Sequence, residues 1–309
     1  RDDVDAWVDA TELPSLAPAT SVEMRDRTGA LLRAYTVVDG IWRLPVDPAR
    51  VDPRYAAMLV AYEDKRFRRH HGVDSLAVLR AGWQALTRGQ VVSGGSTLTM
   101  QVARLLEDSG TGAWSGKIRQ ARLALALERR LSKDEILGLY MALAPFGGNL
   151  EGLRAATFAW FGKEPARLTP AEAALLVALP QSPEARRPDR DPDAARAARD
   201  RVLARMAEAG VLSEEAARAA MRDPVPTRRR AFPALAPHMT DRALAEAPDR
   251  AIHLLTLDGA LQAKLETLAR DRLREAARGV SIAIVAADHV TGEILASVAE
   301  ALDTPISII

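Results

Sequence analysis

The segment EDKRFRRHHG, residues 63 to 72, places two adjacent carboxylates at the end of an apolar run and a group of cations directly after them. If residues 53 to 70 form one helix, Glu63 shares a face with Leu59 and Phe67 at helical spacing. A carboxylate beside apolar side chains is partly desolvated, which raises its pKa and makes it a better proton acceptor near neutral pH. Glu63 is therefore a candidate general base.

A structural interpretation of these carboxylates stays open. Glu63 could simply end a solvated helix or pair with Arg66, because charged helix ends are common. Asp64 is expected on the wetter face, where it can pair with Arg68 four residues later.

A second stretch, SGGSTLTMQ, combines glycines, hydroxyls and an amide over residues 93 to 101. The two glycines predict a tight turn whose backbone can approach a ligand closely. The side chains of Ser96, Thr97 and Gln101 suit the oxygens of a sugar or a phosphate. The alternative is that Ser96 only caps the helix that follows.

Basic residues follow this stretch. Arg104, Lys117, Arg119 and Arg122 are close enough in sequence to form a clamp for a polyanion. A solvated basic helix face would have the same composition. The segment between two expected helices, residues 107 to 117, is rich in glycine and small polar residues, which predicts a mobile flap.

The bulk composition excludes several classes of protein. A chain of 309 residues with 48% hydrophobic and 27% charged residues predicts about two globular domains. The formal net charge of +1 gives no global field for nucleic acid, and the lack of cysteine excludes disulfides and thiolate metal sites. No run approaches the roughly 20 apolar residues of a membrane span. Because the first residue is not Met, we expect that a preceding membrane anchor has been removed.

The elements that must position these residues are mostly helices. Residues 21 to 45 predict a small β element with a turn near Gly29, and a helix is expected to start at Asp52 and Pro53. Further starts, two of them in capping-box form, are Ser132 to Glu135, Thr169 to Glu172, Asp191 and Ser213. The chain from 52 to 222 is therefore predicted to be mainly α.

The pattern divides the chain into four parts. Residues 1–50 form an N-terminal β segment, 51–222 the helical domain, and 223–250 a linker rich in proline and arginine. Residues 251–309 begin a second domain with a strand, an amphipathic helix and a hairpin that turns near Thr291 and Gly292.

Taken together, these stretches resemble the glycosyltransferase module of the class A penicillin-binding proteins, the family-51 peptidoglycan glycosyltransferases. EDKRFRRHHG fits E-D-x-x-F-x-x-H-x-G, and GGSTLTMQ fits G-x-S-T-x-T-x-Q. Two later segments, KDEILGLYMALAPFGGNLEGLRAATFAWFGK and LTPAEAALLVALPQSP, are similar to later motifs of the family. DGIWRLPV, APFGG and the Met of TLTMQ are typical of its 1C branch.

The resemblance implies a mainly α, lysozyme-like glycosyltransferase fold in residues 51–222 and a truncated start of the transpeptidase domain in 251–309. It implies polymerisation of lipid II into glycan strands with inversion at the anomeric carbon, and Glu63 as the general base. The remaining positions that match are substrate-binding: Asp64, Phe67, His70, Ser96, Thr97, Gln101, Arg104, Lys117 and Gln120.

The resemblance also implies surroundings for this chemistry. The expected location is the periplasmic face of the cytoplasmic membrane, and the expected partners are lipid II, the growing glycan strand, the membrane surface and cell-wall synthesis proteins. A leaving diphosphate needs cations or a metal more than a protonated acid, so a divalent cation such as Mg²⁺ is left open as a cofactor.

Three positions depart from the family pattern. Gln120 stands where the family has a second glutamate, Gly116 where it has an arginine, and Ala142 where it has an asparagine. No serine has a lysine three residues later, so the S-x-x-K nucleophile of the transpeptidase is missing and no transpeptidase activity is expected. Two other functions stay open: a lysozyme-like lytic enzyme that uses Glu63 as an acid, and a degenerate scaffold that binds lipid II without turnover.

Overall fold

The computed structural model describes residues 2–76, 79, 96–107, 114–276 and 279–301. The chain forms two compact units, each built from two stretches of sequence. The first unit comprises Arg1–Ala19 and Pro45–Arg230, and the second comprises Thr20–Leu44 and Ala231–Ile309.

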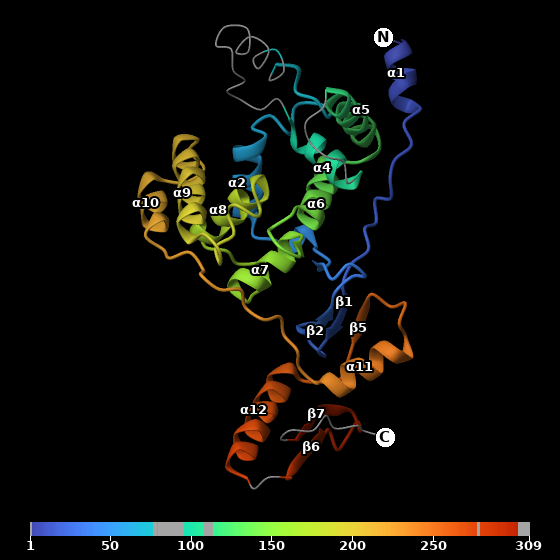
Figure 1. Cartoon of the computed structure of the whole chain (residues 1–309). Helices are drawn as coiled ribbons and strands as arrows, with labels where there is room; N and C mark the ends of the chain where they lie inside the picture. Colours follow the sequence, from blue (N-terminus) through green and yellow to red (C-terminus); the bar gives the residue numbers. More distant parts are fainter. Residues whose placement is uncertain (1, 77–78, 80–95, 108–113, 277–278, 302–309) are drawn as a thin grey trace. The chain divides into compact units, whose positions relative to one another are not determined.

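The first unit is mainly α, as predicted (Figure 1). Its helices are α1 (Asp2–Asp9), α2 (Pro53–Glu63), α4 (Leu98–Leu106), α5 (Trp114–Arg130), α6 (Lys133–Leu143), α7 (Leu153–Phe161), α8 (Pro170–Ala178), α9 (Pro192–Glu208) and α10 (Glu214–Met221). Two 3-10 turns, η1 (Pro48–Arg50) and η2 (Leu179–Gln181), and the short strand β4 (Leu150–Glu151) complete it.

Helix α8 forms the centre of this unit. Its residues from 173 to 178 are all buried, and α2 and α9 pack against it. A helix that is apolar on every side is stable only inside a core, and the sequence AEAALLVAL meets that condition. Trp160, Tyr55 and Phe67 are among the largest fully buried side chains of this unit.

The helix starts are confirmed. Ser132 and Thr169 both complete capping boxes, with Glu135 and Glu172 as the reciprocal partners. Asp52 caps α2 and also accepts a hydrogen bond from the backbone N–H of Leu168 at 2.9 Å. One side chain thus starts a helix and ties it to a segment far along the chain.

The helix predicted over 53 to 70 is shorter than expected. Helix α2 ends at Glu63, because Asp64 adopts φ −154° and ψ 77° and turns the chain away. Asp64 is buried rather than on a wet face, and Arg68 pairs with Asp134 at 2.6 Å instead. The predicted pairing of Asp64 with Arg68 is therefore wrong. Arg66, the other proposed partner, binds Asp74 at 2.9 Å.

The second unit combines two small sheets with two helices. Strands β1 (Val22–Arg25) and β2 (Leu31–Tyr35) pair antiparallel, and β5 (Ile252–Leu254) joins β1 in parallel. The strand β3 (Trp42–Arg43) and the helix α11 (Pro237–Glu246) also belong to this unit. The turn predicted near Gly29 is confirmed.

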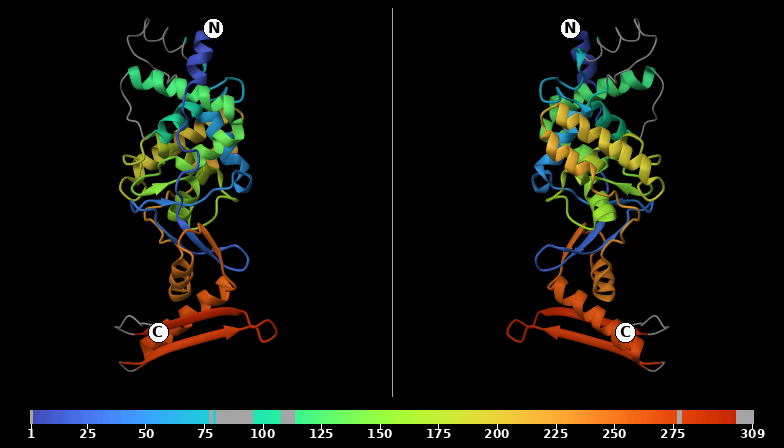
Figure 2. Two further views of the ribbon diagram at one scale, coloured as in Figure 1. Left: turned by 90° about the vertical axis from the view of Figure 1, so that its right-hand side faces the viewer. Right: turned by 90° about the vertical axis from the view of Figure 1, so that its left-hand side faces the viewer.

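The chain after β5 follows the predicted pattern. Helix α12 (Gly259–Glu275) packs on the antiparallel hairpin of β6 (Ser281–Ala287) and β7 (Ile294–Ala301), as both views of Figure 2 show. The hairpin turns at the predicted place, between residues 287 and 294.

Three segments differ from their predicted description. The N-terminal segment contains α1, and the linker predicted over 223–250 contains α11. Helix α11 is ordered because its residues Met239, Ala243 and Leu244 pack on the core formed by Met24, Leu32, Ala236 and Leu257. The last four residues of the segment 107–117, predicted as a flap, belong to α5, which begins at Trp114, and residues 108–113 lie outside the described residues. No helix in the described ranges is long and apolar enough to cross a membrane.

Candidate active site

The carboxylate of Glu63 lies where three segments of the first unit meet. Its Oε2 accepts a hydrogen bond from Nε2 of Gln101 on α4 at 3.0 Å, and its Oε1 accepts one from Nε2 of Gln181 at the end of η2 at 2.7 Å. The two amides fix both oxygens in place. Each oxygen keeps a second lone pair, so the carboxylate can still accept a proton.

The surroundings of Glu63 favour its protonated form. Burial raises the pKa of this carboxyl above its ordinary value, and the two amides and the guanidinium groups of Arg186 and Arg205 offset part of that rise. Glu63 is half-buried at the last turn of α2, and Leu59, one turn earlier, is fully buried. The predicted combination of apolar surroundings and an elevated pKa is present.

Two buried phenols are within electrostatic reach of Glu63. Burial first, and then the charge of Glu63, raises the pKa of Tyr55, and the same causes together with Tyr55 raise the pKa of Tyr140. Both phenols therefore stay protonated and neutral. Arg104 on α4 acts in the opposite direction on Tyr140, which places this cation in the same neighbourhood.

Asp64, Phe67 and His70 form the wall behind the site. Asp64 accepts a hydrogen bond from the backbone N–H of Leu98 at 3.0 Å, and its Oδ2 lies 2.9 Å from Nε2 of His70. Phe67 is fully buried, edge-on to His70, with Nζ of Lys133 lying 4.4 Å from the centre of its ring. The polar contacts of Asp64 are made within the protein, where they lock the loop after α2 onto the start of α4.

Thr97 has a similar internal role. Its hydroxyl accepts from the N–H of Met100 at 3.1 Å and donates to the carbonyl of Gly72 at 2.5 Å. The N-cap of α4 is therefore Thr97, and not Ser96, which precedes it and is half-buried. The two glycines before Ser96 lie outside the described residues.

The predicted cationic clamp is brought together only in part. Arg104 is half-buried on α4, and Lys117 is exposed on α5, where Gln120 is buried. Arg119 pairs with Glu107 at 3.0 Å, while the Arg122 guanidinium lies 4.7 Å from the ring centre of Trp7. The last two cations are thus engaged with other parts of the chain.

Two residues at the site were missed by the sequence analysis. Gln181 and Arg186 belong to the segment LPQSPEAR directly after the buried helix α8. Polar side chains directly after a buried apolar helix indicate the point where the chain leaves the core, and such a point is a candidate for a site residue. Nothing in the local sequence, however, indicates that they reach Glu63.

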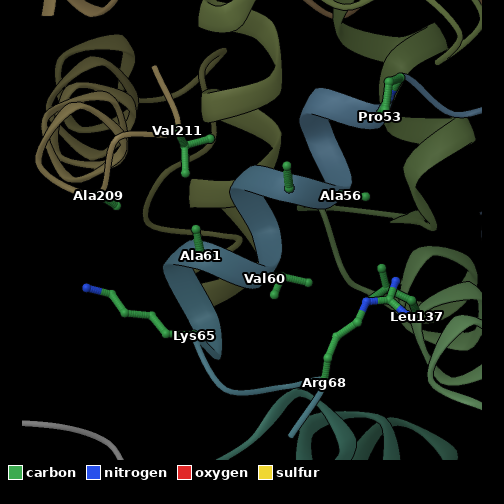
Figure 3. A pocket seen from close by; sticks show the side chains of 10 residues that line it. Pro53, Ala56, Val60, Ala61, Lys65, Arg68, Leu137, Ala209 and Val211 are labelled. Atoms are coloured by element: carbon green, nitrogen blue, oxygen red, sulfur yellow. The ribbon is translucent and has the colours of Figure 1, made fainter. Parts of the chain in front are cut away.

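A separate cavity of about 540 Å³ lies beside α2 (Figure 3). Small apolar side chains of α2 line it, including Ala56, Val60 and Ala61, and Lys65 and Arg68 lie at the end where α2 stops. None of the predicted substrate-binding residues borders this hollow, so it is distinct from the Glu63 site.

The residues around Glu63 do not form a metal centre. Within the part of the chain that the structure describes, no group of three or more His, Asp or Glu side chains could hold a metal ion. Glu63 is bound by amide donors, which compete with a cation for the carboxylate oxygens. Because Mg²⁺ prefers several oxygen ligands, these residues do not fit a resident Mg²⁺ ion.

Comparison with known proteins connects this geometry to a family. Penicillin-binding protein 1C of Escherichia coli (strain K12) is 47% identical over 277 residues, which is 90% of this chain and 36% of that protein. Penicillin-binding protein 1A of Pseudomonas aeruginosa is 38% identical over 146 residues, 47% of this chain and 18% of that protein. The chain thus spans about a third or less of the length of these relatives.

A crystal structure of penicillin-binding protein 1A from Haemophilus influenzae is a distant likeness, with a TM-score of 0.40 and 20% identity over 87% of this chain and 32% of that one. A family profile also matches the chain. The profile described as Transglycosylase matches residues 29–207, which is more than half of the chain and includes Glu63, Gln101 and Gln181. The resemblance inferred from the motifs is confirmed at this level, and the chain belongs to the transglycosylase family.

Proposed function

We propose that this chain is a peptidoglycan glycosyltransferase that joins lipid II units into a glycan strand, with Glu63 as the general base. The observation that carries the proposal is the carboxylate of Glu63, half-buried with a raised pKa and held by two amides within the family-matched region. A base of this kind is what an inverting transfer to a sugar hydroxyl requires.

In the proposed reaction, Glu63 takes the proton of the acceptor hydroxyl as that oxygen attacks the anomeric carbon of the donor. The new glycosidic bond forms on one face of the sugar while the bond to the lipid diphosphate breaks on the other, which inverts the configuration. The diphosphate leaves as an anion, so it needs positive charge and hydrogen-bond donors rather than a protonated acid. No step requires a second carboxylate.

The donor side is assigned to residues of α4 and α5. Arg104 and Lys117 would hold the diphosphate, and the amide of Gln120 would donate to one of its oxygens. Ser96 would line the acceptor side. Asp64, Phe67, His70 and Thr97 would act from behind by fixing the loop and the start of α4, and Gln101 would orient Glu63 directly.

The proposed partners are lipid II and the growing strand at the periplasmic face of the cytoplasmic membrane, together with cell-wall synthesis proteins. Two relatives carry the name penicillin-binding protein, which is consistent with a role in the cell wall. The net charge of +1 gives no reason to add a nucleic acid.

The test uses lipid II with a fluorescent label and compares the chain with its Glu63→Gln variant. We expect the chain to form polymer and the variant to lose at least about 100-fold in rate, since general-base catalysis contributes about 100- to 10,000-fold. The variant should fold, because Gln101 can turn its amide and accept a hydrogen bond from the new side chain.

Thermal unfolding provides the control for this variant, whose unfolding temperature should equal or exceed that of the parent because a partly desolvated charge has been removed. Product size separates the alternatives. Short muropeptides released from preformed glycan would support a lytic enzyme, and lipid II binding without any polymer would support a scaffold. Either result would overturn the proposal.

A further inference from the structure

The carboxylate of Glu63 is the first member of a chain of hydrogen bonds that ends on the backbone of α8. Nε2 of Gln181 donates to Oε1 of Glu63 at 2.7 Å, and Oε1 of Gln181 accepts from Nη1 of Arg186 at 2.9 Å. The same Nη1 donates to the carbonyl of Ala178 at 2.7 Å. The connection spans 123 positions in sequence between its first and last side chains, Glu63 and Arg186.

The chemistry of these groups permits only one orientation of the Gln181 amide. A guanidinium group has donors and no acceptor, so it can bind only the carbonyl oxygen of the amide. The NH₂ group of Gln181 must therefore point to Glu63. The amide of Gln101 has no such constraint, because its side-chain carbonyl has no second partner among the described residues.

Arg186 is held in turn by the C-terminal end of α8. Ala178 is the last residue of α8, where the chain tightens into η2, and Arg186 adds a side-chain hydrogen bond to its carbonyl. The partial negative charge at that end stabilises a cation. The guanidinium group thus completes the end of α8 and orients Gln181 at the same time.

We propose that Gln181 and Arg186 are positioning residues of this site, which hold the Glu63 carboxylate in one orientation and stabilise its charged form. The inference rests on the proposed role of Glu63 as the base. It assigns a task to the LPQSP segment, which the family resemblance singled out without giving it one.

The charged and titratable groups that face Glu63 come from four elements or their flanks. They are Tyr55 on α2, Tyr140 on α6, Arg186 after η2 and Arg205 on α9. The two phenols are neutral, so among these groups the guanidinium groups of Arg186 and Arg205 oppose the effect of burial by charge. Removal of Gln181 or Arg186 should raise the pKa of Glu63 further, because each of them lowers it. The active base is the ionised form, so the acidic limb of the rate profile should then move to higher pH.

The experiment measures kcat/KM on labelled lipid II against pH for the full chain and for Gln181→Leu, Arg186→Ala and Arg190→Ala. The last is the matched control, because Arg190 lies on the same segment but pairs with Glu184 at 3.1 Å. We expect the midpoint of the acidic limb to rise by about half a pH unit or more in the first two variants and to stay unchanged in the control.

A second measurement does not depend on turnover. The side-chain carboxyl of Glu63 is followed by ¹³C NMR during a pH titration, and its signal is assigned from its absence in Glu63→Gln. The same upward shift is expected in Gln181→Leu and Arg186→Ala. Gln181 is exposed and Arg186 half-buried, so both variants should fold, and Arg186→Lys provides a milder change with an intermediate shift.

The two measurements separate the two proposals. If the titration shifts but the parent chain makes no polymer, the proposed function fails and the positioning role stands. If the parent chain polymerises lipid II but neither the titration nor the acidic limb differs between the variants and Arg190→Ala, the positioning role is overturned. A loss of rate without a shift in pH dependence would also overturn it, because that result indicates a purely structural effect.

Discussion

At the scale of single residues, the site depends on how strongly each polar group is separated from water. Gln120 is buried on α5, at the position where the family has a glutamate. A carboxyl introduced there would be desolvated, and its pKa would rise for the same reason as that of Glu63. The proposal stabilises the leaving diphosphate mainly through Arg104 and Lys117, so a second carboxylate is not essential to the reaction.

We therefore predict that Gln120→Glu changes the polymerisation rate by less than about tenfold, roughly 1.4 kcal/mol. Steady-state rates on lipid II for the parent and the variant, measured at the same pH, test this. If the parent is inert and the variant is active, Gln120 marks a disabled site, and a lipid II-binding scaffold becomes the better description.

The sequence predicted Glu63 and Gln101 as site residues, but it did not predict Gln181 or the hydrogen bonds that hold the carboxylate. Glu63 stands out because a carboxylate interrupts an apolar helical face, and that signal is local. The bond from Gln181 to Glu63 joins residues 118 positions apart and depends on how α8 packs against α2, which no local pattern records. Gln101 was predicted to bind substrate, from its amide beside two glycines and two hydroxyls, but its hydrogen bond to Glu63 was not predicted.

At the scale of elements, the end of α2 shows what stops a helix without glycine or proline. The eight residues after Glu63 contain neither, so the local sequence predicts a longer helix. The helix ends because Asp64 leaves the helical conformation and binds the N–H of Leu98 and the imidazole of His70. A tertiary contact outweighs the local preference here, and only the folded arrangement reveals it.

Gly72 is where the loop after α2 comes closest to α5. Its φ is +89°, and a Cβ at this position would lie 2.7 Å from the backbone carbonyl atoms of Ala124. The substitution Gly72→Ala should therefore destabilise the chain by more than the about 1 to 2 kcal/mol that a left-handed alanine alone costs.

The matched control is Gly210→Ala. Gly210 also has a positive φ, +70°, but a Cβ there would meet no atom within 4 Å. Thermal and denaturant unfolding of both variants should show a clearly larger loss for Gly72→Ala. Equal losses would mean that the loop after α2 moves away from α5 at little cost, and the wall behind Glu63 would then be less rigid than the contacts of Asp64 and Thr97 indicate.

At the scale of the whole chain, the division into units crosses the order of the sequence. The hairpin of β1 and β2 is visible from turn chemistry and alternation, and so is the strand β5. The parallel pairing of β1 with β5 cannot be predicted from local sequence, because the paired residues Glu23 and Ile252 are 229 positions apart. The second unit is therefore discontinuous, although the sequence suggests that its parts belong to an N-terminal segment and a C-terminal domain.

This discontinuity predicts the effect of removing residues 231–309. The N–H of Glu23 donates to the carbonyl of Ala251 at 2.9 Å, and that of Arg27 donates to the carbonyl of Leu257 at 3.0 Å. Met24 and Leu32 would also lose the apolar partners Ala236 and Leu257. A two-stranded hairpin without such partners is marginal at best in water.

Hydrogen exchange of the full chain and of a chain ending at Arg230 tests this prediction. In the shorter chain the amides of Glu23 and Arg27 should exchange at rates close to those of an unfolded peptide, since their acceptors are gone. Amides in the middle of α8 should stay protected, because their hydrogen bonds and their packing against α2 and α9 lie within the first unit. Retained protection at Glu23 would show that β1 and β2 are stable without β5 and α11. Loss of protection in α8 would show that the first unit depends on the deleted residues, and in that case Glu63 chemistry would have to be studied only in the full chain.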